Sequence, residues 1–253
     1  MALSDLIDAN PWPAERPAAP VVEWGWGIDG EELLREAVDP GCSVVLEIGS
    51  LLGGSARFWL EHCPGAHVVC VDPWIDVARV EDRPFLEHVP QLAGEVVGRP
   101  DGLFEVFLAS NWDHRERLTP VRGFSPERLA DVAGHGVRPD VVYVDGSHTY
   151  EDVIADLSAA RLLFPEATVC GDDYEWPAVG DAVEYLVACH GDRLRRSGNT
   201  FVIERIGDGG RHLARSARPT GPVERSWPVR AVEAFVGELP GRRVRRQGGR
   251  NRP

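Results

Sequence analysis

Three aspartates follow closely after two apolar, β-branched segments of the sequence. Asp145 comes directly after residues 140–144, and Asp172 and Asp173 come just after residues 167–170. If these segments are neighbouring strands, they lie about 4.8 Å apart and their terminal carboxylates can meet at one edge of a sheet. Crowded carboxylates repel one another unless a cation joins them, and oxygen ligands suit a hard ion such as Mg²⁺. The alternative is that Asp145 caps a local turn and one of the paired aspartates faces solvent.

His148 lies three residues after Asp145, in the turn before a predicted helix. Imidazole titrates near neutral pH, so a histidine in this position can take a proton from a reacting group. A lone histidine is more often structural, and only its position beside the candidate cation ligands favours chemistry. We therefore predict that His148 is a catalytic base.

A glycine-rich turn follows a strongly apolar segment of the chain. Residues 44–48 read Val-Val-Leu-Glu-Ile and lead into Gly49-Ser50-Leu51-Leu52-Gly53-Gly54-Ser55. A strand that enters such a turn and then a helix leaves backbone N–H groups free to bind a polar ligand. Gly49 and Gly53 are separated by three residues without glycine, which differs from the G-x-G-x-x-G spacing of dinucleotide sites. The spacing therefore argues against a dinucleotide.

Two acidic residues accompany this turn. Glu47 lies two residues before Gly49, where a carboxylate can face the ammonium group of an amino acid. Asp72 ends the next apolar segment, 23 residues after Gly49, where a carboxylate can accept both hydrogen bonds from a ribose diol. The order of strand, glycine turn, helix, strand and acid favours ligand binding over plain turn residues.

The elements that must position these residues alternate along the chain. Short β-branched segments separated by helical patterns indicate βαβ units on a parallel sheet that is buried on both faces. The most regular helical pattern starts after Thr149, a plausible N-cap, and Pro165 ends it. The predicted strands are Ser43–Ile48, His67–Val71, Leu118–Arg122, Asp140–Val144, Ala167–Cys170 and Thr200–Ile206, and the predicted helices include Glu31–Val38, Gly54–Cys63 and Tyr150–Phe164.

The chain divides into three parts. Residues 1–39 form a lead-in, irregular up to residue 30 and rich in Pro and Trp, followed by a helix. Residues 40–206 form the main domain, in which residues 75–117 are either a substrate lid or a plain insertion. Residues 207–253 form a basic tail rich in Gly, Pro and Arg, which we expect to be flexible, with one short helix allowed at 229–239.

Charge and composition narrow the class of protein. The 253 residues carry a net charge of −13, although the tail alone is basic. An acidic body argues against a nucleic-acid partner, because phosphate contacts need a basic surface. No apolar run approaches the length of a membrane span, and the first residues do not resemble a secretion signal, so we expect a cytoplasmic protein. The five cysteines lack C-x-x-C spacing, which favours buried free thiols over a disulfide or zinc framework.

These motifs together resemble a known enzyme family. Over residues 40–206 the chain is similar to class I S-adenosylmethionine-dependent methyltransferases, and more narrowly to the methyltransferase family 24 group that includes metal-dependent macrolide-sugar O-methyltransferases. The resemblance is carried by Leu46-Glu47-Ile48-Gly49 with Gly53-Gly54-Ser55, Val71-Asp72-Pro73-Trp74, Thr119-Pro120-Val121-Arg122-Gly123, Asp140 to Tyr150 and Gly171-Asp172-Asp173-Tyr174.

The resemblance implies a fold and a chemistry. The fold would be an α/β, Rossmann-like, doubly wound and mostly parallel sheet with helices on both faces. The reaction would be O-methylation of a small-molecule or sugar hydroxyl, with S-adenosylmethionine as cofactor and a divalent cation beside it. The strands that end at Asp145 and Asp172 are neighbours in this family, so the expected cation ligands are Asp145, Asp172 and Asp173, with Mg²⁺ or another divalent cation bound.

The resemblance also places the methyl donor. Its methionine end would lie near Glu47 and Gly49, its ribose on Asp72, and its adenine near the turn after Gly123. Phe124 departs from the pattern, because relatives often carry a small or acidic residue there. The expected donor-binding residues are Glu47, Gly49, Ser50, Gly53, Ser55, Asp72, Phe124, Ser125 and Asp145.

Two other functions remain open from the sequence. One is a nucleotide-dependent oxidoreductase of the same fold class, and the other is a non-catalytic binding module that uses the basic tail. If the chain is an enzyme, the acceptor is a small molecule, such as a sugar or a planar natural product. The tryptophans outside the strands either line an aromatic pocket for it or belong to the core: Trp24, Trp26, Trp112 and Trp176. The resemblance further allows a homo-oligomer.

Overall fold

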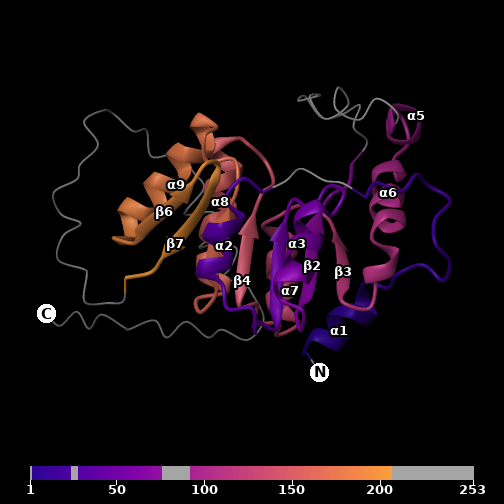
Figure 1. The fold of residues 1–253 in the computed structure, drawn as a ribbon, viewed down its shortest axis with the longest axis horizontal. Helices are drawn as coiled ribbons and strands as arrows, with labels where there is room; N and C mark the ends of the chain where they lie inside the picture. The colour runs from indigo at the N-terminus through magenta and orange to yellow at the C-terminus, as the bar shows by residue number, and fades with distance from the viewer. Residues whose placement is uncertain (1, 24–27, 76–91, 207–253) are drawn as a thin grey trace, which may run out of the picture.

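A single sheet of seven strands organises the part of the chain that the computed structural model describes, which is residues 2–23, 28–75 and 92–206 (Figure 1). The strand order is β3-β2-β1-β4-β5-β7-β6. Neighbours from β3 to β5 run parallel, whereas β7 is antiparallel to both β5 and β6. The strands are β1 Val44–Ile48, β2 His67–Asp72, β3 Leu118–Arg122, β4 Val141–Val144, β5 Thr168–Gly171, β6 Arg193–Ser197 and β7 Thr200–Glu204.

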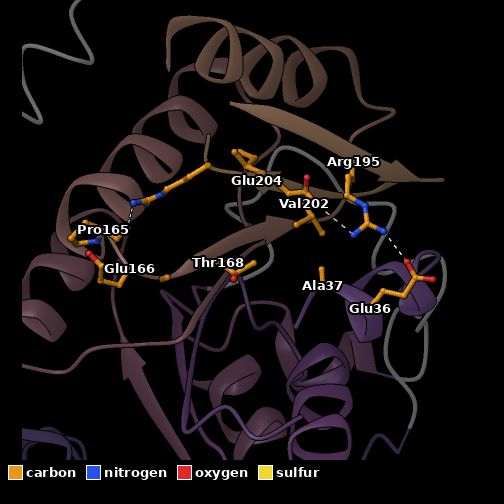
Figure 2. Close-up of a pocket in the computed structure, with 11 residues that line it drawn as sticks. Glu36, Ala37, Pro165, Glu166, Thr168, Arg195, Val202 and Glu204 are labelled. Atoms are coloured by element: carbon orange, nitrogen blue, oxygen red, sulfur yellow. Dashed lines mark hydrogen bonds and ion pairs between the residues drawn. The ribbon is translucent and has the colours of Figure 1, made fainter. Parts of the chain in front are cut away.

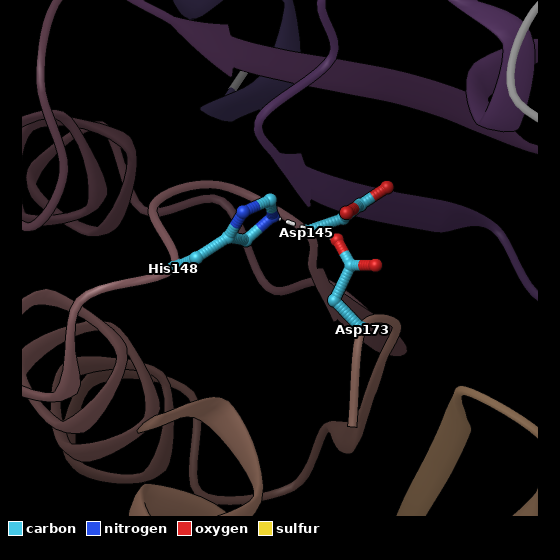
Figure 3. A group of neighbouring side chains, drawn as sticks. All are labelled: Asp145, His148 and Asp173. Atoms are coloured by element: carbon cyan, nitrogen blue, oxygen red, sulfur yellow. Dashed lines mark ion pairs between the residues drawn. The ribbon is translucent and has the colours of Figure 1, made fainter. Parts of the chain in front are cut away.

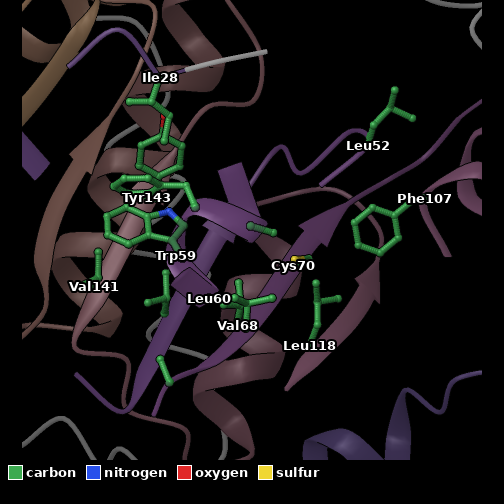
Figure 4. Packing of buried hydrophobic residues seen from close by; sticks show 14 of the residues in the cluster. Ile28, Leu52, Trp59, Leu60, Val68, Cys70, Phe107, Leu118, Val141 and Tyr143 are labelled. Carbon is green, nitrogen blue, oxygen red and sulfur yellow. The ribbon is translucent and has the colours of Figure 1, made fainter. Parts of the chain in front are cut away.

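Helices cover both faces of the sheet, because successive strand residues point to opposite sides and both sides are apolar. Along β1, Val45 belongs to one buried cluster and Leu46 to the other. The first cluster packs under α2 (Glu31–Ala37), α3 (Gly54–His62) and α6 (Gly102–Ser110), and Figure 4 shows part of it. The second packs under α1 (Ala2–Ala9), α7 (Glu127–Gly134), α8 (Tyr150–Leu163) and α9 (Pro177–His190). The predicted doubly wound α/β fold is confirmed.

The predicted elements agree closely with the structure where their residues are apolar. Each of the six predicted strands is present, with bounds that differ by at most two residues. The helix after Thr149 forms as expected, and the Thr149 hydroxyl accepts a hydrogen bond from the backbone N–H of Asp152 at 3.3 Å. The helix then ends at Leu163, before Pro165.

The lead-in prediction was wrong in part. Residues 2–9 form helix α1, because Leu6 is buried in the second cluster, and this burial stabilises a helix too short to form alone. Strand β6 was also missed. Its sequence, Arg-Leu-Arg-Arg-Ser, has no apolar alternation, since it is a half-exposed edge strand that pairs only with β7.

Several other predictions concern segments that lie partly or wholly outside the described residues. Within the predicted lid, α5 (Ala93–Val96), α6 and the 3₁₀ turn η3 (Trp112–His114) are described, whereas residues 76–91 lie outside. The tail 207–253, its expected short helix and residues 24–27 also lie outside.

All five cysteines are free, as predicted, but Cys189 is exposed rather than buried. No helix within these ranges is long and apolar enough to cross a membrane.

A cavity of about 450 Å³ lies beside β5 and β7 (Figure 2). It includes Thr168, the first residue of β5, so it lies at the opposite end of this strand from Asp172 and Asp173. Among its lining residues, Arg195 forms ion pairs with Glu36 and Glu204. Arg195 is therefore already paired, and the cavity lies away from the aspartates, so it is not our candidate site.

Gly171, the last residue of β5, allows this strand to lie close to its neighbours. A Cβ atom there would lie 2.2 Å from the Val144 carbonyl oxygen and 2.6 Å from Cζ of Phe201. We expect Gly171→Ala to lower the free energy of unfolding by about 1–3 kcal/mol, measured by urea denaturation, because overpacking displaces β4 or β7. Gly134→Ala is the control, because that position in α7 is open and alanine favours a helix. Equal stability of the two variants would contradict this account.

Candidate functional site

The ends of β1 and β4 meet in a direct backbone contact. The strands pair up to Ile48 and Val144, and the Asp145 N–H then donates to the Ile48 carbonyl at 2.9 Å. Gly49 follows with φ of 85°, and a Cβ atom on it would lie 2.0 Å from the Asp145 carbonyl oxygen. Only glycine tolerates both this backbone conformation and this approach. The glycine turn and Asp145 therefore lie against each other.

Asp145, His148 and Asp173 converge at this edge of the sheet (Figure 3). One potential ligand atom from each residue lies within 4.8 Å of the other two. Nε2 of His148 lies 2.7 Å from Oδ2 of Asp173, and the imidazole stacks on the Trp176 indole with ring centroids 4.7 Å apart. Two loops, one after β4 and one after β5, thus supply a group of two carboxylates and one imidazole.

This group is crowded with negative charge. Burial and the nearby carboxylates of Asp173 and Asp172 raise the pKa of Asp145 well above its usual range. A bound cation would reverse this effect, because it favours the charged form of each carboxyl group. Two carboxylate oxygens and an imidazole nitrogen form a ligand set that suits several divalent ions. The residues therefore fit a divalent cation.

Asp172 differs from its predicted place among the cation ligands. Its N–H continues the pairing with β4 by donating to the Val144 carbonyl, and its Oδ1 accepts a hydrogen bond from Thr200 Oγ1 at 3.1 Å. Asp173 adopts a left-handed conformation with φ of 61°, and its Oδ2 lies 2.7 Å from Nε2 of His148. Burial and Asp173 raise the pKa of Asp172 to about 6. The converging set contains His148 instead of Asp172.

Glu47 is fully buried beneath the glycine turn. Its Oε2 accepts a hydrogen bond from the Cys70 thiol, whereas Oε1 has no hydrogen-bond partner among the described residues. Burial raises the pKa of Glu47, and the hydroxyls of Ser50 and Ser55 partly oppose this rise. A buried carboxylate oxygen without a donor is costly, and an ammonium group would satisfy it. This geometry fits the predicted contact with the amino-acid end of the donor.

Asp72 shapes the glycine turn itself. Its Oδ2 accepts from the Leu51 N–H at 2.9 Å, and its Oδ1 accepts from the Trp74 N–H at 2.6 Å. The Trp74 indole in turn donates to the Leu51 carbonyl, and both residues have positive φ. Each carboxylate oxygen retains a second lone pair, which a ribose hydroxyl can use. The structural role of Asp72 was not visible in its spacing from Gly49.

The predicted adenine contacts follow β3, next to Asp72. The Gly123 N–H donates to the Asp72 carbonyl at 3.0 Å, and Phe124 is 60% exposed. Ser125 is hydrogen-bonded to Asp156, an almost fully buried residue of α8 that the sequence analysis missed. Burial raises the pKa of Asp156 to about 7, although the Ser125 hydroxyl opposes the rise. A single acid within a helix has no distinguishing sequence pattern, so only the fold identifies it.

Asp156 predicts a pH dependence of stability. Its pKa is higher in the folded protein than the ordinary value of 3.8, so the unfolded chain loses the proton first as pH rises. The free energy of unfolding therefore decreases as the pH rises from about 4 to about 7, because the folded protein must either keep the proton or bury a charged carboxylate. We expect the free-energy advantage of Asp156→Asn over the parent protein to increase from pH 5 to pH 8 in urea denaturation. Asp8→Asn, on the exposed side of α1, is the control. A constant difference would contradict the assigned burial.

Comparisons with known proteins found one matching family and several similar structures. The profile of a family described as "Methyltransferase domain" matches residues 46–174, just over half of the chain, whereas no curated protein matches. A methyltransferase from Podospora anserina with S-adenosylhomocysteine bound is similar in structure, with 14% identity over 70% of this chain and 76% of that chain and a TM-score of 0.45. A TDP-rhamnose 3'-O-methyltransferase of calicheamicin biosynthesis has 17% identity over 71% and 77%, with a TM-score of 0.44.

The MycE methyltransferase of mycinamycin biosynthesis, with Mg and S-adenosylhomocysteine bound, has 19% identity over 79% of this chain and 48% of that chain, with a TM-score of 0.41. At these identities and TM-scores, the likenesses support no conclusion about this chain. The family match decides between the functions left open by the sequence, in favour of the methyltransferase. The chain therefore belongs to this methyltransferase domain family and is an S-adenosylmethionine-dependent methyltransferase.

Proposed function

We propose that this enzyme methylates a hydroxyl group of a small molecule, with a divalent cation held by Asp145, His148 and Asp173. The observation that carries the proposal is the contact between Gly49 and Asp145. The glycine turn, where the donor would bind, lies against the backbone of Asp145, one of the candidate cation ligands. A methyl group and an acceptor oxygen must come within about 3.5 Å of each other before transfer, and the closeness of the two proposed sites supports such an approach.

The donor would be held by the residues around the turn. The unpartnered Oε1 of Glu47 would accept from the ammonium group, and the free lone pairs of Asp72 would accept from the ribose diol. Ser50 and Ser55 remain proposed donor-binding residues because their hydroxyls influence Glu47. Phe124 and Ser125 remain proposed for adenine because they follow β3 beside Asp72.

The cation site would hold the acceptor oxygen. When bound, a divalent cation supplies Lewis acidity that lowers the pKa of a hydroxyl group. The acceptor hydroxyl loses its proton, its oxygen forms a bond to the methyl carbon, and the bond between that carbon and the sulfonium sulfur breaks. The products are a methyl ether, S-adenosylhomocysteine and a proton. The protein supplies position and charge, and the donor supplies the methyl group.

The acceptor proposed here is a ring compound such as a sugar or planar natural product. Trp176 is 45% exposed although it stacks on His148, so part of its indole remains available to solvent beside the cation ligands. An aromatic face packs well on an apolar ring face. Trp112 instead packs against Trp12, and Trp24 and Trp26 lie outside the described residues. A homo-oligomer and a cytoplasmic location stay predictions.

The cation assignment can be measured without an acceptor, by titrating Mn²⁺ into the protein and following its electron paramagnetic resonance signal. We expect Asp145→Asn to weaken Mn²⁺ binding by at least about 100-fold, because it removes a proposed charged ligand. Asp172→Asn is the matched control and should cost no more than about tenfold, the lower end for an outer-shell residue. Equal effects of the two substitutions, or no binding to the parent protein, would contradict the proposed set.

His148→Ala separates the two roles considered for the imidazole. As a cation ligand, His148 should be required for tight Mn²⁺ binding, because its Nε2 lies within the converging group. If His148 is instead the base predicted from the sequence, His148→Ala should leave the Mn²⁺ affinity unchanged. It should then lower kcat, which can be measured with an identified acceptor. We expect the first result, because Nε2 already contacts the carboxylate of Asp173.

The donor assignment predicts opposite effects on binding and stability. We expect Glu47→Gln to weaken S-adenosylhomocysteine binding by about 1.5–3 kcal/mol in calorimetry, the range for a lost hydrogen bond to a charged group. The melting temperature of the free protein should stay the same or rise, because burial of the charged carboxyl is unfavourable. Glu61→Gln, on the exposed side of α3, is the control. Unchanged affinity of Glu47→Gln would remove this residue from the donor site.

A further inference from the structure

Asn111 is a fully buried amide that contacts the glycine turn from the segment between β2 and β3. Its Nδ2 donates to the Leu52 carbonyl at 3.0 Å and to the Phe107 carbonyl at 2.8 Å. Gly53 lies directly against it, since a Cβ atom at Gly53 would be 2.5 Å from Nδ2 of Asn111. Gly53 also has φ of 79°, so its backbone conformation and its contact with Asn111 both require glycine.

Arg57 completes this contact from the first turns of α3. Its Nη1 donates to Oδ1 of Asn111 at 2.8 Å and to the Leu52 carbonyl at 3.2 Å. The Leu52 carbonyl therefore receives two side-chain donors, one from α3 and one from the end of α6. Burial lowers the pKa of Arg57, whereas the charge of Glu47 raises it. The guanidinium and the amide thus hold the second half of the turn in place.

The lead-in contacts the residues on both sides of Asn111. The guanidinium of Arg16 donates twice to the Ala109 carbonyl, at 2.7 and 3.1 Å, and the Val22 N–H donates to Ser110 Oγ at 2.9 Å. The residue after Asn111, Trp112, packs edge to face on Trp12. The lead-in, the end of α6 and the glycine turn therefore form one continuous set of contacts.

We propose that Asn111 is a positioning residue for the methyl donor, which couples the docking of α6 to the conformation of the glycine turn. Asn111 would not touch the donor. It would hold the Leu52 carbonyl so that the turn is preformed, and donor binding would in turn stabilise α6 against local opening. The inference rests on the proposed placement of the donor at residues 49–53.

The test compares Asn111→Asp with Asn10→Asp, in which the Nδ2 donor to the Leu6 carbonyl on α1 is lost instead. S-adenosylhomocysteine is titrated into each protein by calorimetry, and hydrogen exchange of residues 102–110 is followed with and without it. We expect Asn111→Asp to bind at least about tenfold more weakly, because a carboxylate cannot donate to the two carbonyls. In the parent protein and in Asn10→Asp, the ligand should slow exchange in α6, and in Asn111→Asp it should not.

Two variants of Arg57 keep the proposal open to contradiction if Asn111→Asp does not fold. Arg57→Met should lower the affinity severalfold, and Arg57→Lys should recover part of the loss, because it can still donate one hydrogen bond. Unchanged affinity in Asn111→Asp, or in both Arg57 variants, overturns the coupling. If the parent protein binds no S-adenosylhomocysteine, the placement of the donor fails instead, so the two failures are distinguishable.

Discussion

The site depends on the close approach of two backbones, where Gly49 lies against the carbonyl of Asp145. Adjacent parallel strands end at the same edge of a sheet, and the absence of a side chain at Gly49 allows the turn after β1 to contact the loop after β4. Any side chain there would separate the two loops. The proposed donor-binding residues of the glycine turn come from the first of these loops, and two of the three candidate cation ligands, Asp145 and His148, come from the second.

Unfavourable features collect at this same edge. Glu47, Asp145 and Asp172 all have raised pKa values because burial or neighbouring carboxylates disfavour their charged forms. Three described residues other than glycine adopt left-handed conformations within three residues of the ends of strands β1, β2 and β5: Leu51, Trp74 and Asp173. Strained backbones and unneutralised acids persist only where the surrounding fold enforces them, and they are typical of ligand-binding sites. A cationic donor and a divalent cation are the ligands that would relieve this negative charge.

A second layer of contacts supports the first. Asp72 and Trp74 hold the beginning of the turn, whereas Asn111 and Arg57 hold its end. The segment between β2 and β3, which the sequence predicts to be either a lid or an insertion, therefore also supports the glycine turn. The lead-in contacts this segment through Trp12, Arg16 and Val22, so parts far apart in sequence meet next to the glycine turn.

The sequence by itself determined the parallel strands, because burial of a sheet on both faces produces continuous apolar runs. It also determined the helix after Thr149, because a helix cap depends on neighbouring residues alone, and the order of the glycine turn and its acidic residues along the chain. It did not reveal β6, whose arginines tolerate an exposed edge. Only the tertiary structure decided that His148 lies with Asp145 and Asp173 while Asp172 accepts a hydrogen bond from Thr200, because these contacts join residues from separate loops and strands. The contact of Asn111 with Leu52 spans 59 residues and exists only once α6 has docked, so no local pattern could predict it.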